Sequence, residues 1–128
     1  MAKVLVAEDD QEIRRLLADI LDDDGHEVME ASDGIDTLER IPTFQPDLLA
    51  LDLMMPRLDG FEVPSRLRSD PATQDLPVVV ISAVPPSQGE LRGWRLGVKH
   101  YIPKPFEDEH VQLSVKIALS ESLRTEGS

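Results

Sequence analysis

The residues best able to do chemistry in this chain are polar side chains that directly follow short apolar runs. In chain order they are Glu8, Asp9 and Asp10, then Asp52, then Ser82, and finally Lys104, which precedes Pro105. Taken singly, each is weak evidence. An acidic residue after a strand is more often a helix cap than a metal ligand, and a serine there usually bonds nearby backbone. A site is indicated because several successive apolar runs are each followed by such a residue.

The apolar runs alternate with helical patterns, which predicts strands and helices in turn. Strand-like runs occupy residues 4–7, 27–31, 47–52, 78–81 and 98–102, and helical patterns occupy 13–21, 35–41, 61–67, 89–96 and 107–123. Five such units predict an α/β fold with a parallel sheet covered by helices on both faces. In such folds the chemistry lies at the carboxyl ends of the strands.

The ends of the helices carry their own signals. Asp9 or Asp10 is placed to cap the first helix, and Gly25 to end it in a left-handed conformation. Pro42 is expected to stop the second helix, and Pro64 to disfavour the third unless it falls in the first turn. The apolar stripe predicted to bury the first helix comprises Ile13, Leu16, Leu17, Ile20 and Leu21.

This arrangement would bring three carboxylates, those of Glu8, Asp9 and Asp52, to one edge of the sheet. Carboxylates packed so closely repel one another unless a cation lies between them. Oxygen ligands without histidine or cysteine favour Mg²⁺, which often completes its shell with phosphate oxygens. Lys104 and Ser82 would offer a charge and a hydroxyl to the same oxygens. The pattern therefore indicates phosphoryl chemistry with an aspartate as nucleophile.

Composition narrows the function classes. The chain has 128 residues and a net charge of −12, which argues against direct binding to nucleic acid or to an anionic membrane. It has no cysteine, so disulfides, zinc–thiolate sites and cysteine nucleophiles are excluded. No run approaches the length of a membrane span, and no secretory signal is evident. We expect one cytoplasmic domain over residues 1–123, with a polar tail or linker stub at 124–128.

Four segments together resemble the receiver domain of bacterial two-component response regulators, in particular the single-receiver type of chemotaxis regulators. They are KVLVAEDD (residues 3–10), PDLLALDLMMPRLDG (46–60), PVVVISA (77–83) and YIPKPF (101–106). The likeness extends over residues 3–123 with the motifs in order. It implies a flavodoxin-like, doubly wound (βα)5 three-layer sandwich, with five parallel strands in the order 2-1-3-4-5.

The resemblance also implies roles for the acidic residues. Asp52 is the expected phosphoacceptor. Asp9 would bind Mg²⁺ directly and Glu8 would do so through water, with the Met54 backbone carbonyl as a further ligand; Mn²⁺ is expected to substitute. Glu8 departs from many relatives, which carry aspartate there, and the longer side chain changes the reach to the metal.

Further roles implied by the resemblance fall on the fourth and fifth strands. Lys104 would pair with the phosphoryl group and precede Pro105 through a cis peptide bond. Ser82 is the expected switch hydroxyl, and the Ala83 backbone N–H would face the phosphoryl group. Tyr101 matches the aromatic residue whose ring turns inward when that hydroxyl moves.

The implied partners are proteins. A sensor histidine kinase or a histidine phosphotransfer protein would donate the phosphoryl group. The surface over residues 89–123, formed by the fourth helix, fifth strand and fifth helix, would control an unknown downstream protein, and phosphorylation-dependent homodimerisation stays open. The chain is thus expected to be a switch that only assists its own phosphorylation and dephosphorylation, not an enzyme.

Two other readings remain open. The first is a degenerate receiver that acts as a phosphorylation-independent interaction scaffold, for which Glu8 and the Pro85-Pro86 pair after the fourth strand are the unusual features. The second is an Mg²⁺-dependent phosphatase with an aspartyl nucleophile. That class carries a second aspartate two residues after the first, where this chain has Met54.

Overall fold

A five-stranded parallel sheet forms the centre of the computed structural model, which describes residues 2–55, 62–83, 98 and 100–127. The strands lie in the order β2-β1-β3-β4-β5, and all neighbouring pairs are parallel. Their bounds are β1 Lys3–Ala7, β2 Glu27–Ala31, β3 Leu48–Leu51, β4 Val78–Ser82 and β5 His100–Pro103. The predicted parallel sheet and its strand order are confirmed.

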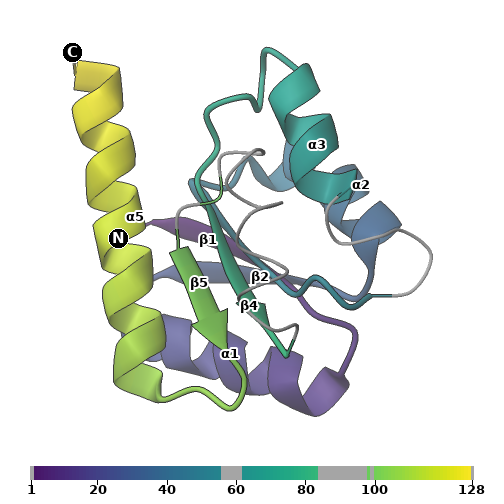
Figure 1. Ribbon diagram of the computed structural model, residues 1–128, viewed down its shortest axis with the longest axis vertical. Helices are drawn as coiled ribbons and strands as arrows, with labels where there is room; N and C mark the ends of the chain where they lie inside the picture. Colours follow the sequence, from purple (N-terminus) through teal and green to yellow (C-terminus); the bar gives the residue numbers. More distant parts are fainter. Residues whose placement is uncertain (1, 56–61, 84–97, 99, 128) are drawn as a thin grey trace.

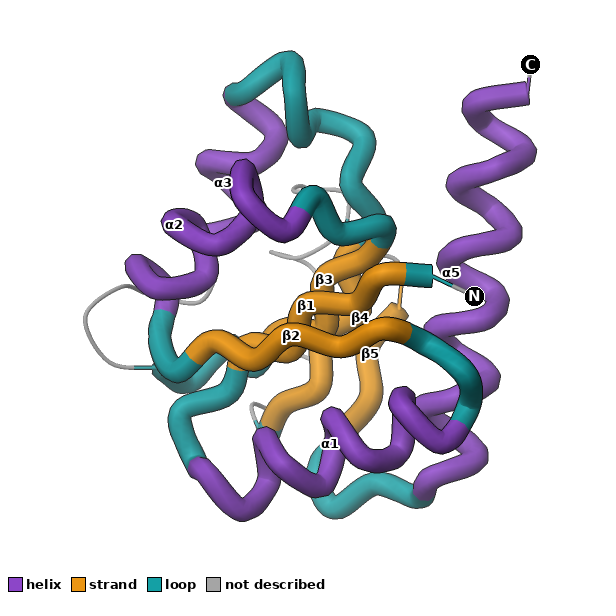
Figure 2. The backbone as a smooth tube through the Cα atoms, turned by 180° about the vertical axis from the view of Figure 1, so that it is seen from behind, coloured by secondary structure: helices purple, strands orange, loops and turns teal. Residues whose placement is uncertain are grey.

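Helices cover both faces of this sheet, as predicted. Their bounds are α1 Gln11–Asp23, α2 Gly34–Phe44, α3 Glu62–Ser69 and α5 Asp108–Gly127. Figures 1 and 2 show α1 and α5 on one face and α2 and α3 on the other. Within the described part of the chain, no helix is long and apolar enough to cross a membrane. The helix predicted over 89–96 and the Pro85-Pro86 pair lie outside the described residues.

Alternation along the strands divides the core in two. In β1, Val4 and Val6 pack with α1 and α5, whereas Leu5 and Ala7 pack with α2 and α3. Every residue of the central strand β3 is buried. A strand covered on both faces has no polar side, which is why these runs read as unbroken apolar segments.

The first helix begins as predicted. The Asp10 carboxylate accepts hydrogen bonds from the N–H groups of Glu12 and Ile13, at 2.9 and 3.1 Å. Gly25 follows the helix at φ 91°, a left-handed conformation that glycine adopts without steric cost. The apolar stripe predicted for this helix included Leu16, but Leu16 is 48% exposed, so the buried face is narrower than predicted.

The prediction that Pro42 stops the second helix is wrong. α2 runs through Pro42 to Phe44, whose ring is buried in the core. Gln45 then ends the helix in the left-handed region, and its N–H donates to the Ile41 carbonyl at 2.8 Å. Burial of Phe44 therefore outweighs the missing donor of an exposed proline. The last helix also runs further than predicted, to Gly127 rather than to residue 123.

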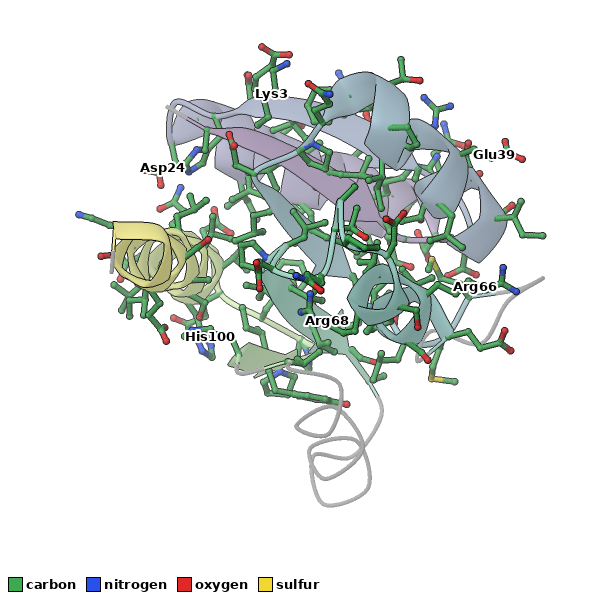
Figure 3. The ribbon with its side chains drawn as sticks, turned by 90° about the horizontal axis from the view of Figure 1, so that it is seen from above. Lys3, Asp24, Glu39, Arg66, Arg68 and His100 are labelled. Carbon is green, nitrogen blue, oxygen red and sulfur yellow. The ribbon has the colours of Figure 1, made fainter. Side chains whose placement is uncertain are left out.

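Polar contacts attach α5 to its neighbours. Figure 3 looks along this helix and shows His100 beside it. The His100 Nε2 lies 2.7 Å from a carboxylate oxygen of Glu121 on α5. The Gln112 amide donates to the Ile20 carbonyl of α1 at 3.1 Å. These contacts connect α5 with both β5 and α1.

We predict that Pro42→Ala stabilises the protein. The substitution gives the last turn of α2 a backbone donor at an exposed position, for a gain of about 1 kcal/mol after allowing for a more flexible unfolded chain. Urea denaturation would measure it.

Pro64→Ala is the matched control, because Pro64 is the third residue of α3 and its N–H would have no partner within the helix. It should be neutral or destabilising. Equal gains in the two variants would contradict this account of Pro42.

Candidate functional site

The candidate site lies at the carboxyl edge of the sheet, where strand register aligns the chain. Ala7 of β1 pairs with Leu51 of β3, so Glu8 and Asp52 leave the sheet side by side. The Asp52 N–H donates to the Ala7 carbonyl at 2.9 Å. Carboxylate oxygens of Glu8, Asp9 and Asp52 all lie within 4.8 Å of one another. The structure thus brings together the three carboxylates that the sequence placed at one edge.

One ammonium group lies among these carboxylates. The Lys104 Nζ is 3.2 Å from an oxygen of Asp52 and donates a hydrogen bond to Glu8. Glu8 is only 1% exposed and Asp52 only 4% exposed. The backbone fixes the lysine too, because its N–H donates to the Ser82 carbonyl at 3.1 Å. Within the part of the chain that the structure describes, two buried carboxylates therefore share one cation.

Burial and neighbouring charges shift the pKa values of Glu8 and Lys104. Loss of solvation raises the pKa of Glu8 from 4.5 to about 7, opposed by hydrogen bonds from Lys104 and the Asp10 N–H and assisted by the neighbouring Asp52. Burial also disfavours the charged form of Lys104. Hydrogen bonds and charge from Glu8 and Asp52 outweigh that effect, so the pKa of Lys104 is raised.

The donor set fits a hard divalent cation. Among the described residues, three carboxylates face one ammonium, so the cluster as described carries excess negative charge in a largely buried position. All three side chains offer oxygen, and Asp9 is the exposed member through which a hydrated ion would reach the others. Such a site matches Mg²⁺, which needs one or two carboxylates and retains several waters.

The other predicted site residues lie on the adjoining strands. Ser82 ends β4 and is fully buried; Ala83 follows it and is exposed. Tyr101 on β5 is half-buried and packs against the core cluster that includes α2 and α3. The Lys104–Pro105 peptide bond is cis, the isomer expected from the resemblance.

Met54 lies at the open side of the site. Its N–H donates to an Asp52 carboxylate oxygen at 3.1 Å, while its side chain is exposed. That hydrogen bond orients the Asp52 carboxylate. It comes from Met54, the residue whose backbone carbonyl was predicted to bind the metal.

Sequence reasoning missed the contacts that hold Glu8 in place. The Asp10 N–H donates to the second Glu8 carboxylate oxygen at 3.1 Å, and the Arg14 guanidinium donates to the Glu8 carbonyl at 2.9 Å. An arginine in the second turn of an amphipathic helix is ordinarily a surface residue. Its contact depends on how α1 packs beside β2, which no local pattern specifies.

The sequence of this chain is similar to those of known proteins. The family model described as "Response regulator receiver domain" matches residues 4–116. The chain is 38% identical over 119 residues to the DNA-binding dual master transcriptional regulator RpaA of Synechocystis sp., covering 93% of this chain and 49% of RpaA. It is 39% identical over 117 residues to the response regulator MprA of Mycobacterium ulcerans, covering 91% and 50%. The chain thus spans about half the length of these relatives.

Solved structures agree with the sequence comparison. A Francisella response regulator receiver domain superposes with a TM-score of 0.87 at 30% identity, covering 95% of this chain and 99% of that one. The chemotaxis response regulator CheY4 of Vibrio cholerae gives a TM-score of 0.85 at 28% identity, covering 92% and 98%.

The raised pKa of Glu8 predicts a pH-dependent effect of Glu8→Gln. Because Glu8 holds its proton more tightly when folded, its contribution to stability is present below about 4.5 and is lost as the pH rises towards about 7. Glutamine lacks this loss. The unfolding free energy of the variant, minus that of the wild type, should therefore increase between about pH 5 and about pH 8.

Denaturant titrations in EDTA would measure the difference. Glu39→Gln, on the exposed side of α2 (Figure 3), is the matched control. A difference for Glu8→Gln that is constant or shrinks with pH would show that burial of Glu8 does not dominate its titration.

Proposed function

The chain belongs to the response regulator receiver domain family, and from that premise we propose that Asp52 accepts a phosphoryl group from the phosphohistidine of a sensor histidine kinase or histidine phosphotransfer protein. Receiver domains act as phosphoacceptor switches rather than as dedicated enzymes, and they interact with histidine kinases and downstream effectors. The observation that carries the proposal is the Asp52 carboxylate, held 3.2 Å from the Lys104 ammonium beside two further carboxylates.

The transfer needs positioning and charge neutralisation more than covalent chemistry. A carboxylate oxygen of Asp52 forms a bond to phosphorus as the bond from phosphorus to the imidazole nitrogen breaks, and the electron pair leaves with that nitrogen. The Met54 N–H orients the carboxylate, and the Lys104 ammonium is close enough to meet the phosphoryl oxygens.

Receiver domains bind Mg²⁺ through acidic residues. Here Asp9, Asp52 and the Met54 carbonyl would hold the ion directly and Glu8 would do so through water, with Mn²⁺ as a substitute. When bound, the ion would neutralise charge on the phosphoryl oxygens. A hydrated ion at this place would compete with Lys104 for the Glu8 carboxylate. Because Glu8 is almost fully buried and Lys104 is partly buried, the two interactions would be energetically coupled.

Phosphorylation would change the surface of β5 and α5 through Ser82. Its hydroxyl and the Ala83 N–H would turn towards the phosphoryl oxygens, and the Tyr101 ring would follow inward. Support comes from the Lys104 N–H, which joins the end of β5 to Ser82, and from the His100–Glu121 contact between β5 and α5. A shift from about 1:99 to 99:1 between two states takes roughly 5.5 kcal/mol of differential interaction.

The downstream partner is proposed to be a protein, in the cytoplasm. The relative RpaA is a DNA-binding regulator twice as long as this chain. The −12 charge of this domain disfavours direct contact with nucleic acid, so output would pass by protein contact, including homodimerisation.

The central prediction is that incubation with acetyl phosphate and Mg²⁺ adds one phosphoryl group, detected by intact mass. Asp52→Asn or EDTA should abolish the gain. Asp47→Asn, which changes an exposed aspartate before the same strand β3, should keep it. Absence of labelling in a wild type that binds Mg²⁺ would instead favour the scaffold function.

A second prediction concerns Ser82→Ala. The variant should still be phosphorylated on Asp52, but the change in amide hydrogen exchange of β5 and α5 that accompanies phosphorylation should be lost. Ser69→Ala, at the last residue of α3, is the matched control and should respond as the wild type does. A full response in Ser82→Ala would show that the hydroxyl does not couple the site to β5.

A further inference from the structure

The loop between β1 and α1 is held at both peptide groups that flank Asp9. On one side, the Glu8 carbonyl accepts a hydrogen bond of 2.9 Å from Arg14 Nη1. On the other, the Asp10 N–H donates to a Glu8 carboxylate oxygen at 3.1 Å. The two peptide planes on either side of a Cα determine the direction of its side chain. These two hydrogen bonds therefore fix the direction in which the Asp9 side chain points from the backbone.

Arg14 is itself fixed by β2. Its Nε lies 3.2 Å from a carboxylate oxygen of Glu30, and its side chain is only 16% exposed. The next residue of that strand, Ala31, accepts the Glu8 N–H at 3.1 Å. Two consecutive residues of β2 thus hold the backbone of Glu8. Ala31 bonds its N–H directly, and Glu30 holds the arginine that bonds its carbonyl.

We propose that Arg14 is a positioning residue for the divalent-cation site, setting the orientation of Asp9 through the Glu8 carbonyl. The inference rests on the proposed Mg²⁺ site of the preceding section. Groups that orient metal ligands from outside the ligand shell typically change metal affinity 10–100-fold when removed. Arg14 touches no carboxylate of the cluster, so it acts through backbone geometry.

Removing Arg14 has opposite expected effects on Mg²⁺ affinity, depending on whether its charge or its hydrogen bond matters more. A guanidinium near a cation site repels the incoming ion, so loss of its charge alone would tighten binding. Loss of the hydrogen bond to Glu8 would free the loop and weaken binding. Arg15 separates the two effects, because it also pairs with Glu30, at 3.2 Å, but its contacts do not include the Glu8 carbonyl and it is 69% exposed.

The experiment is calorimetric titration of Mg²⁺ into the full chain at one mildly alkaline pH for every variant, because metal ligands bind the ion in their deprotonated form. Arg14→Gln should weaken Mg²⁺ affinity about tenfold or more. Arg15→Gln should leave affinity unchanged or slightly tighter. Arg14→Lys, which keeps the charge and one donor, should recover part of the loss.

Two outcomes would overturn the inference: wild-type or tighter affinity in Arg14→Gln, or equal losses in Arg14→Gln and Arg15→Gln. Far-UV circular dichroism would establish that the variants are folded. Glu30→Ala offers an independent route, since it removes the carboxylate that holds Arg14 Nε without changing the loop, and unchanged affinity there would also count against the inference. A wild type that binds no Mg²⁺ would overturn the proposed function as well.

Discussion

Two carboxylates buried against one ammonium are the interaction on which the rest of this structure depends. Removing Glu8 and Asp52 from water costs several kcal/mol each before any compensation, and Lys104 brings one positive charge against their two negative charges. The raised pKa of Glu8 records that imbalance. A divalent cation would complement this charge, so under the proposed function the arrangement would sacrifice stability in its metal-free form for affinity towards an ion. Such a sacrifice is typical of binding sites rather than of structural ion pairs.

Only a rigid frame can hold like charges this close. The parallel register of β1 with β3 places Glu8 and Asp52 side by side, and any slip by one residue would turn each side chain to the opposite face. Two separate apolar clusters, one on each face, prevent that slip. The fold therefore contributes to the chemistry through register: apolar residues on β1 and β3 fix distances between polar residues that follow them.

Much of this could be predicted because apolar runs and the residues after them are local signals. The strand-end positions of Glu8, Asp52 and Lys104 follow from where each run stops, and parallel strands bring such ends together. What failed involved competition with tertiary packing. Pro42 does not end α2 because Phe44, two residues later, is buried. Neither the near-complete burial of Glu8 nor the hydrogen bond from Arg14 to its carbonyl has a sequence pattern.

The same charge imbalance gives the proposed switch its direction. In the structure, the Lys104 ammonium is shared between Glu8 and Asp52, and its backbone N–H is bonded to Ser82. Under the proposed function, a phosphoryl group on Asp52 would add negative charge on one side of that ammonium, and a cation at the cluster would compete with it for Glu8 on the other. Both changes would favour the contact of Lys104 with Asp52, and the Lys104 backbone is bonded to Ser82 at the end of β4. Since β5 contacts α5 through His100 and Glu121, the proposed switch would reach an outer helix through covalent and hydrogen-bonded connections already present.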